Sequence, residues 1–118
     1  MNFNILTYDG STINIQGGPD LAEFCKQLNN PGLLTLSLGG EVLSKDLFKI
    51  VIPEGELTGE YEVYTKDGAV YLTDIESYNA DEISAQTNTI HGPFILIGSV
   101  LIQRANIKRI KLATVPTT

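Results

Sequence analysis

The feature that most constrains the fold of this chain is a weak internal repeat. Residues 3–10 read FNILTYDG and residues 61–68 read YEVYTKDG, so that a threonine, an aspartate and a glycine recur at matching places. Residues 20–29 align in the same way with residues 79–88, where a glutamate, a glutamine and an asparagine recur. Self-similarity of this kind indicates a fold built by repeating one supersecondary unit.

The repeat extends to the end of each half of the chain. Residues 36–50 align with residues 95–110 when one residue is inserted, and both stretches are rich in apolar side chains. We therefore predict two tandem repeats, at 2–53 and 60–113, joined by a connector at 54–59. Half of a 118-residue chain is marginal as an independent core, so the two copies should share one core with approximate two-fold symmetry.

An Asp-Gly pair marks a turn near the start of each copy. Asp9-Gly10 lies between FNILTY and STINIQ, and Asp67-Gly68 lies between YEVYTK and AVYLTD. Asp-Gly between β-prone runs favours a tight hairpin, because a type I′ turn needs a positive φ at both central residues. We expect two such hairpins in matching positions.

A short helix should follow each hairpin. Asp20 and Asn79 are good N-caps, and a glutamate three residues later, Glu23 or Glu82, completes the pattern of a capping box. Apolar residues with i, i+3, i+4, i+7 spacing give the first helix a core face, made of Leu21, Phe24, Cys25 and Leu28. The equivalent set in the second helix is thinner, so we expect that helix to be half exposed.

Short apolar runs that predict strands close each copy. They occupy residues 33–38, 42–43 and 47–52 in the first copy, and residues 94–97, 100–102 and 107–112 in the second. The order in each copy is then β-β-α-β-β-β, which belongs to the α+β class with mostly antiparallel sheet and two short helices. We expect residues 1–118 to form one such domain.

The stretch 94–102, FILIGSVLI, carries no charge. High β-propensity without charge makes a segment prone to aggregation when it is exposed. We therefore expect this stretch at the buried centre of the sheet. The alternative is that part of it forms an interface with a partner or with a second copy.

Composition argues against several classes of protein. The chain has 14 acidic and 8 basic residues, and its net charge of -6 at pH 7 disfavours nucleic acid as a partner, because Lys and Arg supply most of that affinity. No apolar run approaches the roughly 18–20 residues of a membrane span, and the first residues lack the pattern of a signal peptide. With one cysteine, the chain cannot form an internal disulfide. We expect a cytoplasmic protein that engages no membrane.

No set of residues indicates catalysis. Cys25 and His91 could form a thiol–imidazole pair, but Cys25 falls on the apolar face of a helix and His91 falls in a turn. The paired acids already have roles as turn and cap residues, and no calcium-loop, phosphate-loop or serine-nucleophile motif is present. We therefore expect no enzyme activity, no metal and no cofactor.

Basic residues and tyrosines gather in the second copy and mark a candidate interaction surface. Four of the eight bases lie between residues 104 and 111, while tyrosines occur in and near the predicted hairpins. Tyrosine is enriched at interfaces, and a basic strip suits an acidic partner; the alternative is a solvated strand whose edge is blunted by charge. The candidate residues are Tyr61, Tyr64, Tyr71, Arg104, Lys108, Arg109 and Lys111.

These observations together favour a non-catalytic protein-binding module. We expect an accessory, adaptor or inhibitor-type protein of the kind that phages and mobile elements encode. The alternative is a structural subunit that assembles through open strand edges. A nucleic-acid-binding protein, or a small enzyme with a site between the repeats, is disfavoured.

Overall fold

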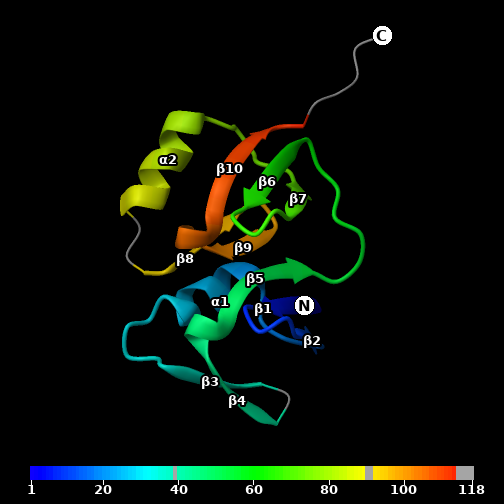
Figure 1. Cartoon of the computed structure of the whole chain (residues 1–118), viewed down its shortest axis with the longest axis vertical. Helices are drawn as coiled ribbons and strands as arrows, with labels where there is room; N and C mark the ends of the chain where they lie inside the picture. Colours follow the sequence, from blue (N-terminus) through cyan, green and yellow to red (C-terminus); the bar gives the residue numbers. More distant parts are fainter. Residues whose placement is uncertain (39, 90–91, 114–118) are drawn as a thin grey trace.

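The structure is a computed structural model that describes residues 1–38, 40–89 and 92–113. Within these residues the chain forms ten strands and two α-helices, which confirms the α+β class (Figure 1). The first half contains β1 (Phe3–Thr7), β2 (Thr12–Ile15), α1 (Leu21–Leu28), β3 (Thr35–Leu38), β4 (Glu41–Ser44) and β5 (Phe48–Pro53). The second half contains β6 (Tyr61–Thr65), β7 (Val70–Thr73), α2 (Ala80–Thr89), β8 (Phe94–Ile97), β9 (Val100–Gln103) and β10 (Ile107–Leu112).

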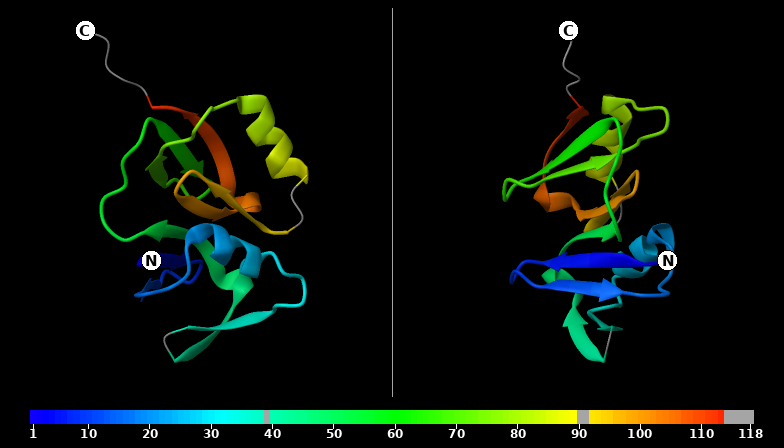
Figure 2. Two further views of the ribbon diagram at one scale, coloured as in Figure 1. Left: turned by 180° about the vertical axis from the view of Figure 1, so that it is seen from behind. Right: turned by 90° about the vertical axis from the view of Figure 1, so that its right-hand side faces the viewer.

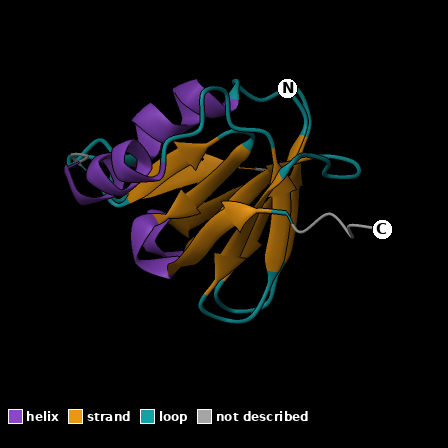
Figure 3. Cartoon of the chain, turned by 90° about the horizontal axis from the view of Figure 1, so that it is seen from above, coloured by secondary structure: helices purple, strands orange, loops and turns teal. Residues whose placement is uncertain are grey.

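The order of elements is the same in the two halves. A turn of 3-10 helix that the sequence did not predict precedes the last strand of each half, at Lys45–Leu47 and at Arg104–Asn106. That the halves are copies related by two-fold symmetry stays a prediction. Both α-helices lie toward one side of the molecule (Figure 2 and Figure 3).

The strands form three sheets, and every pairing in the described chain is antiparallel. A five-stranded sheet has the order β2-β1-β5-β9-β8, a three-stranded sheet the order β10-β6-β7, and β3 pairs with β4. The two halves are therefore joined inside the five-stranded sheet, where β9 of the second half pairs with β5 of the first.

The hairpin turns form where Asp-Gly predicts them, but they are not type I′ turns. Only the glycine has a positive φ, 86° at Gly10 and 91° at Gly68. Thr7 N–H donates to Ser11 O at 3.0 Å, and Gly10 N–H donates to Thr7 O at 3.2 Å, which is a turn followed by a left-handed glycine. Neither Asp9 nor Asp67 has a positive φ, so the prediction of two left-handed residues in each turn is wrong.

Both predicted N-caps are confirmed. Asp20 Oδ1 accepts a hydrogen bond from Glu23 N–H at 2.8 Å, and Asn79 Oδ1 accepts one from Glu82 N–H at 3.1 Å. These bonds satisfy main-chain donors that a helix start leaves without a partner. The second helix buries less of its surface, as predicted, because Ile83 is only half buried.

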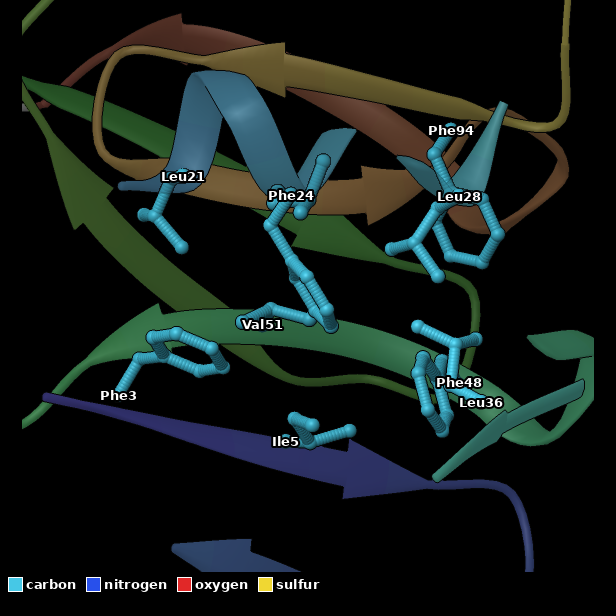
Figure 4. Packing of buried hydrophobic residues seen from close by; sticks show 10 residues of the cluster. Phe3, Ile5, Leu21, Phe24, Leu28, Leu36, Phe48, Val51 and Phe94 are labelled. Carbon is cyan, nitrogen blue, oxygen red and sulfur yellow. The ribbon is translucent and has the colours of Figure 1, made fainter. Parts of the chain in front are cut away.

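Two apolar clusters form the core. The first lies under α1, where Leu21, Phe24 and Leu28 point toward side chains of β1 and β5 (Figure 4). The second is built from β5, β6, β8 and β9 and includes Ile50, Val63, Ile95, Ile97, Val100 and Ile102. The uncharged stretch around β8 and β9 contributes to both clusters, which confirms its burial. Its expected place at the centre of the sheet is wrong for β8, which is the edge strand of the five-stranded sheet. Neither of the described helices combines the length and the apolar character needed to cross a lipid bilayer.

Candidate interaction surface

Six of the seven candidate residues lie on the three-stranded sheet. Tyr61 and Tyr64 are on β6, Tyr71 is on β7, and three bases are on β10. The seventh, Arg104, lies in the 3-10 helix before β10, where its Nη1 donates to Thr87 O at 2.8 Å and ties that segment to α2. The sheet therefore gathers residues that are up to 50 positions apart, from Tyr61 to Lys111.

The outer face of this sheet carries a mixed aromatic and basic patch. Arg109 lies opposite Tyr64, and Lys111 Nζ lies 5.6 Å from the centre of the Tyr64 ring. The Tyr64 hydroxyl donates to Glu62 Oε1 at 3.2 Å and fixes the ring between charged neighbours. We call Glu62, Tyr64, Arg109 and Lys111 the outer patch. Its combination of an aromatic ring with cations is invisible in the linear sequence, because β10 and β6 are distant in the chain.

The other two tyrosines face inward. Tyr61 stacks on Tyr78 with ring centres 4.5 Å apart. Tyr71 lies opposite Val63 and packs against the second cluster, where burial raises the pKa of its hydroxyl. Both rings therefore stabilise the second half and add little to the outer patch.

A groove lies between α2 and β10. It has a volume of about 250 Å³, with Ile83, Thr87 and Asn88 on its helix side and Lys108 and Ile110 on its strand side. Lys108 is exposed and sits where the pairing of β10 with β6 shifts by a bulge. In the part of the chain that the structure describes, β10 pairs with β6 alone, so the edge of β10 that borders this α2–β10 groove is open.

A second open edge lies on the β3–β4 hairpin. β4 pairs only with β3 among the described strands, and Val42 on β4 is 74% exposed. Leu34, just before β3, is also 74% exposed. Large exposed apolar residues beside unpaired main-chain groups mark a contact site. The sequence predicted these strands but gave no signal that they would stay outside the main sheet.

A polar cluster holds the two halves together beside the β5–β9 joint. Lys49 Nζ on β5 lies 2.5 Å from Asp67 Oδ2 in the turn between β6 and β7. The Tyr8 hydroxyl donates to Gln103 Oε1 at 3.0 Å. The hydrogen bond from Lys49, followed by the one from Thr65, lowers the pKa of the Asp67 carboxyl to about 2.

Asp67 should make folding sensitive to acid. Because the folded-state pKa lies below the ordinary value of 3.8, the unfolded chain binds the proton more readily. The contribution of Asp67 to stability is therefore present above about pH 4 and is lost as the pH falls toward about 2. Urea unfolding of Asp67→Asn across this range should give a shallower pH dependence than the wild-type chain. The exposed Asp81→Asn is the matched control, and an equal change in both variants would contradict the assignment.

Catalytic groups do not converge within the described residues. Cys25 is half buried and its Sγ lies 3.8 Å from Phe94 O, and burial raises the pKa of its thiol. His91, the other member of the considered pair, lies outside the described residues. Among the residues that the structure describes, no three His, Cys, Asp or Glu side chains are grouped to hold a metal ion. The absence of enzyme activity stays a prediction.

Comparison of the chain with protein-family models, with curated proteins and with solved structures finds no match. The features of the described chain that bear on function are the outer patch, the α2–β10 groove and the open edges of β10 and β4.

Proposed function

We propose that this chain is a non-catalytic module that binds protein through the β10 side of its second half. The observation that carries the proposal is an open strand edge that borders both the α2–β10 groove and the basic, aromatic outer patch. Strand addition to such an edge gains affinity from main-chain hydrogen bonds and specificity from the side chains around it. The role is that of an accessory, adaptor or inhibitor.

Charge supports a protein partner with acidic residues. The chain carries a net charge of -6, yet Lys108, Arg109 and Lys111 gather on one strand. A local basic strip on an acidic protein steers and orients a partner of complementary charge.

We also infer that the two halves are duplicated copies of one unit. What supports this is the recurrence of individual main-chain bonds. Tyr8 N–H donates to Leu47 O at 3.0 Å, and Lys66 N–H donates to Asn106 O at 3.0 Å, at the equivalent places. The pairing of β1 with β5 and that of β6 with β10 also share a register shift near their ends. Two-fold symmetry would require a second joint, between β4 and β10.

A second candidate function is a self-assembling structural subunit. The β3–β4 hairpin favours it, because Leu34 and Val42 expose apolar surface beside an unpaired edge. An edge of this kind is suited to pair with another chain.

The test of protein binding uses charge reversal on the outer patch. Tagged full-length chain is incubated with host-cell extract, and retained proteins are identified by mass spectrometry. Arg109→Glu combined with Lys111→Glu should weaken capture by about tenfold, because both cations border the open edge. Lys26→Glu reverses a charge at an exposed site on α1, away from β10, and should leave capture unchanged. If the wild-type chain retains no protein and does not self-associate, the proposal is wrong.

A further inference from the structure

The joint between the two halves is a strand hairpin held between a strand and a helix. On one side β9 pairs with β5, with Ile102 opposite Ile50 and Leu101 opposite Val51. On the other side, Asn29 at the C-terminal end of α1 binds the main chain of β8. Its Nδ2 donates to Phe94 O and its Oδ1 accepts from Phe94 N–H, both at 2.8 Å. The β8–β9 hairpin is thereby fixed along both of its edges.

The α2–β10 groove is the same kind of space in the second half. By order in the chain, β10 corresponds to β5 and α2 corresponds to α1. Asn29 follows the N-cap of α1, Asp20, by nine residues. Asn88 follows the N-cap of α2, Asn79, by the same number and is therefore the equivalent residue. The groove is bordered by Asn88 and by Ile110, which lies opposite Val63 on β6 as Val51 lies opposite Ile5 on β1.

The β3–β4 hairpin is the matching part in the first half. β4 corresponds to β9, so that Val42 takes the place of Leu101. Leu101 is fully buried at the internal joint, whereas Val42 is 74% exposed. The sheets also complement each other: β7-β6-β10 followed by β4-β3 would repeat the order β2-β1-β5-β9-β8 of the five-stranded sheet.

The hairpin cannot reach the groove of its own chain. The β3–β4 hairpin lies at one end of the longest axis, while α2 and the upper part of β10 lie toward the other end (Figure 1). The five-stranded sheet lies between the β3–β4 hairpin and α2. A β3–β4 hairpin in this groove would therefore have to come from another molecule.

We propose that the α2–β10 groove binds the β3–β4 hairpin of a second copy of this chain. This inference rests on the proposed function and names the partner of the β10 edge. Carrying over the register of the internal joint places Val42 opposite Ile110 and Glu41 opposite Lys111 of the neighbouring copy. The negative Glu41 on β4 then lies opposite the positive Lys111 on β10, and opposite charges favour cross-strand pairing.

The external joint is weaker than the internal one. On β8 the side chains toward α1 include Phe94 and Leu96, whereas β3 carries Thr35 and Ser37 at the equivalent positions. Less apolar surface is therefore removed from water, so assembly depends on concentration. Each copy would offer its β3–β4 hairpin to one neighbour and its α2–β10 groove to another. The contact is therefore head-to-tail and gives closed rings or open chains.

Charge exchange across the joint tests the register. Size-exclusion chromatography with light scattering of the full-length wild-type chain should show a mass that rises with concentration. Glu41→Lys and Lys111→Glu should each weaken association by about tenfold, since each places like charges opposite each other. The double variant carries the pair in reverse and should recover association. Glu56→Lys and Lys66→Glu are exposed controls with the same charge changes and should associate as the wild-type chain does.

Circular dichroism confirms that each variant is folded before its mass is compared. A wild-type chain that stays monomeric at all concentrations overturns the inference, as does a double variant that associates no better than the single variants. A monomer that still captures another protein through Arg109 and Lys111 defeats this inference and leaves the proposed function standing. A monomer that captures nothing defeats both.

Discussion

Truncation of Phe24 to alanine is expected to lower the free energy of unfolding by about 3–5 kcal/mol, the usual loss for a buried phenylalanine. Phe24 is 1% exposed and lies at the centre of the first cluster, with its ring 5.1 Å from Phe3 and 6.3 Å from Phe48. The change would remove ring contacts to β1 and β5 and leave a cavity beneath α1. Urea unfolding followed by circular dichroism measures the loss.

Ile83→Ala on α2 is the matched control for this prediction. Ile83 aligns with Phe24 in the repeat but is half buried, so its truncation should cost about 1 kcal/mol. A loss this large in Phe24→Ala can approach the whole stability of a small domain. Phe24→Leu is therefore included, because it keeps most of the apolar volume and should cost less than half as much. Equal losses for Phe24→Ala and Ile83→Ala would contradict the assignment of the core to α1.

The different burial of the two helices could be predicted from the sequence, since it depends on local pattern. Leu21, Phe24 and Leu28 repeat with helical spacing, and all three are buried. The N-cap of each helix was also predictable, because Asp20 and Asn79 act on main-chain groups only three residues away. Interactions of such short range leave a signature that one sequence can display.

Assignment of the strands to sheets could not be predicted. The β3–β4 and β8–β9 hairpins have matching places in the two halves, yet only the β8–β9 hairpin joins the five-stranded sheet. The choice depends on the contact of β9 with β5 and of β8 with α1, and these partners are distant in the chain. The turn type was missed because Asp-Gly suits both a type I′ turn and a turn followed by a left-handed glycine, and the pair alone does not choose between them.

The candidate site was predictable as a region but not as a surface. The sequence pointed to the bases of β10 and the tyrosines of β6 and β7. Alternation along β6 separates Tyr64 from the inward Tyr61, and that separation could have been drawn from the sequence. The open edges could not be predicted from the sequence, because which strand lies at an edge depends on the pairing of the whole sheet.

Replacement of Asn29 by alanine is the second change expected to have a large effect, a loss of about 2–3 kcal/mol in the free energy of unfolding. β8 is an edge strand, so its outward main-chain groups have no neighbouring strand to bind. The Asn29 amide supplies that partner with two hydrogen bonds of 2.8 Å to the fully buried Phe94. Without it, the Phe94 N–H remains beneath α1 with neither protein nor bulk water to satisfy it, and the Phe94 carbonyl keeps the weak Cys25 thiol donor, whose Sγ lies 3.8 Å away.

Asn88→Ala separates this role from a general effect of losing an asparagine at the end of a helix. Asn88 has the equivalent place on α2 but is exposed, so its replacement should change the unfolding free energy of the monomer by less than about 0.5 kcal/mol. If a second copy binds in the α2–β10 groove, Asn88→Ala should instead weaken self-association, because Asn88 would then grip β3 as Asn29 grips β8. Asn29 and Asn88 would thus perform one function at two joints, the first within the chain and the second between chains. Equal destabilisation of the monomer by both variants would show that the two helices are anchored alike and would remove the basis for this comparison.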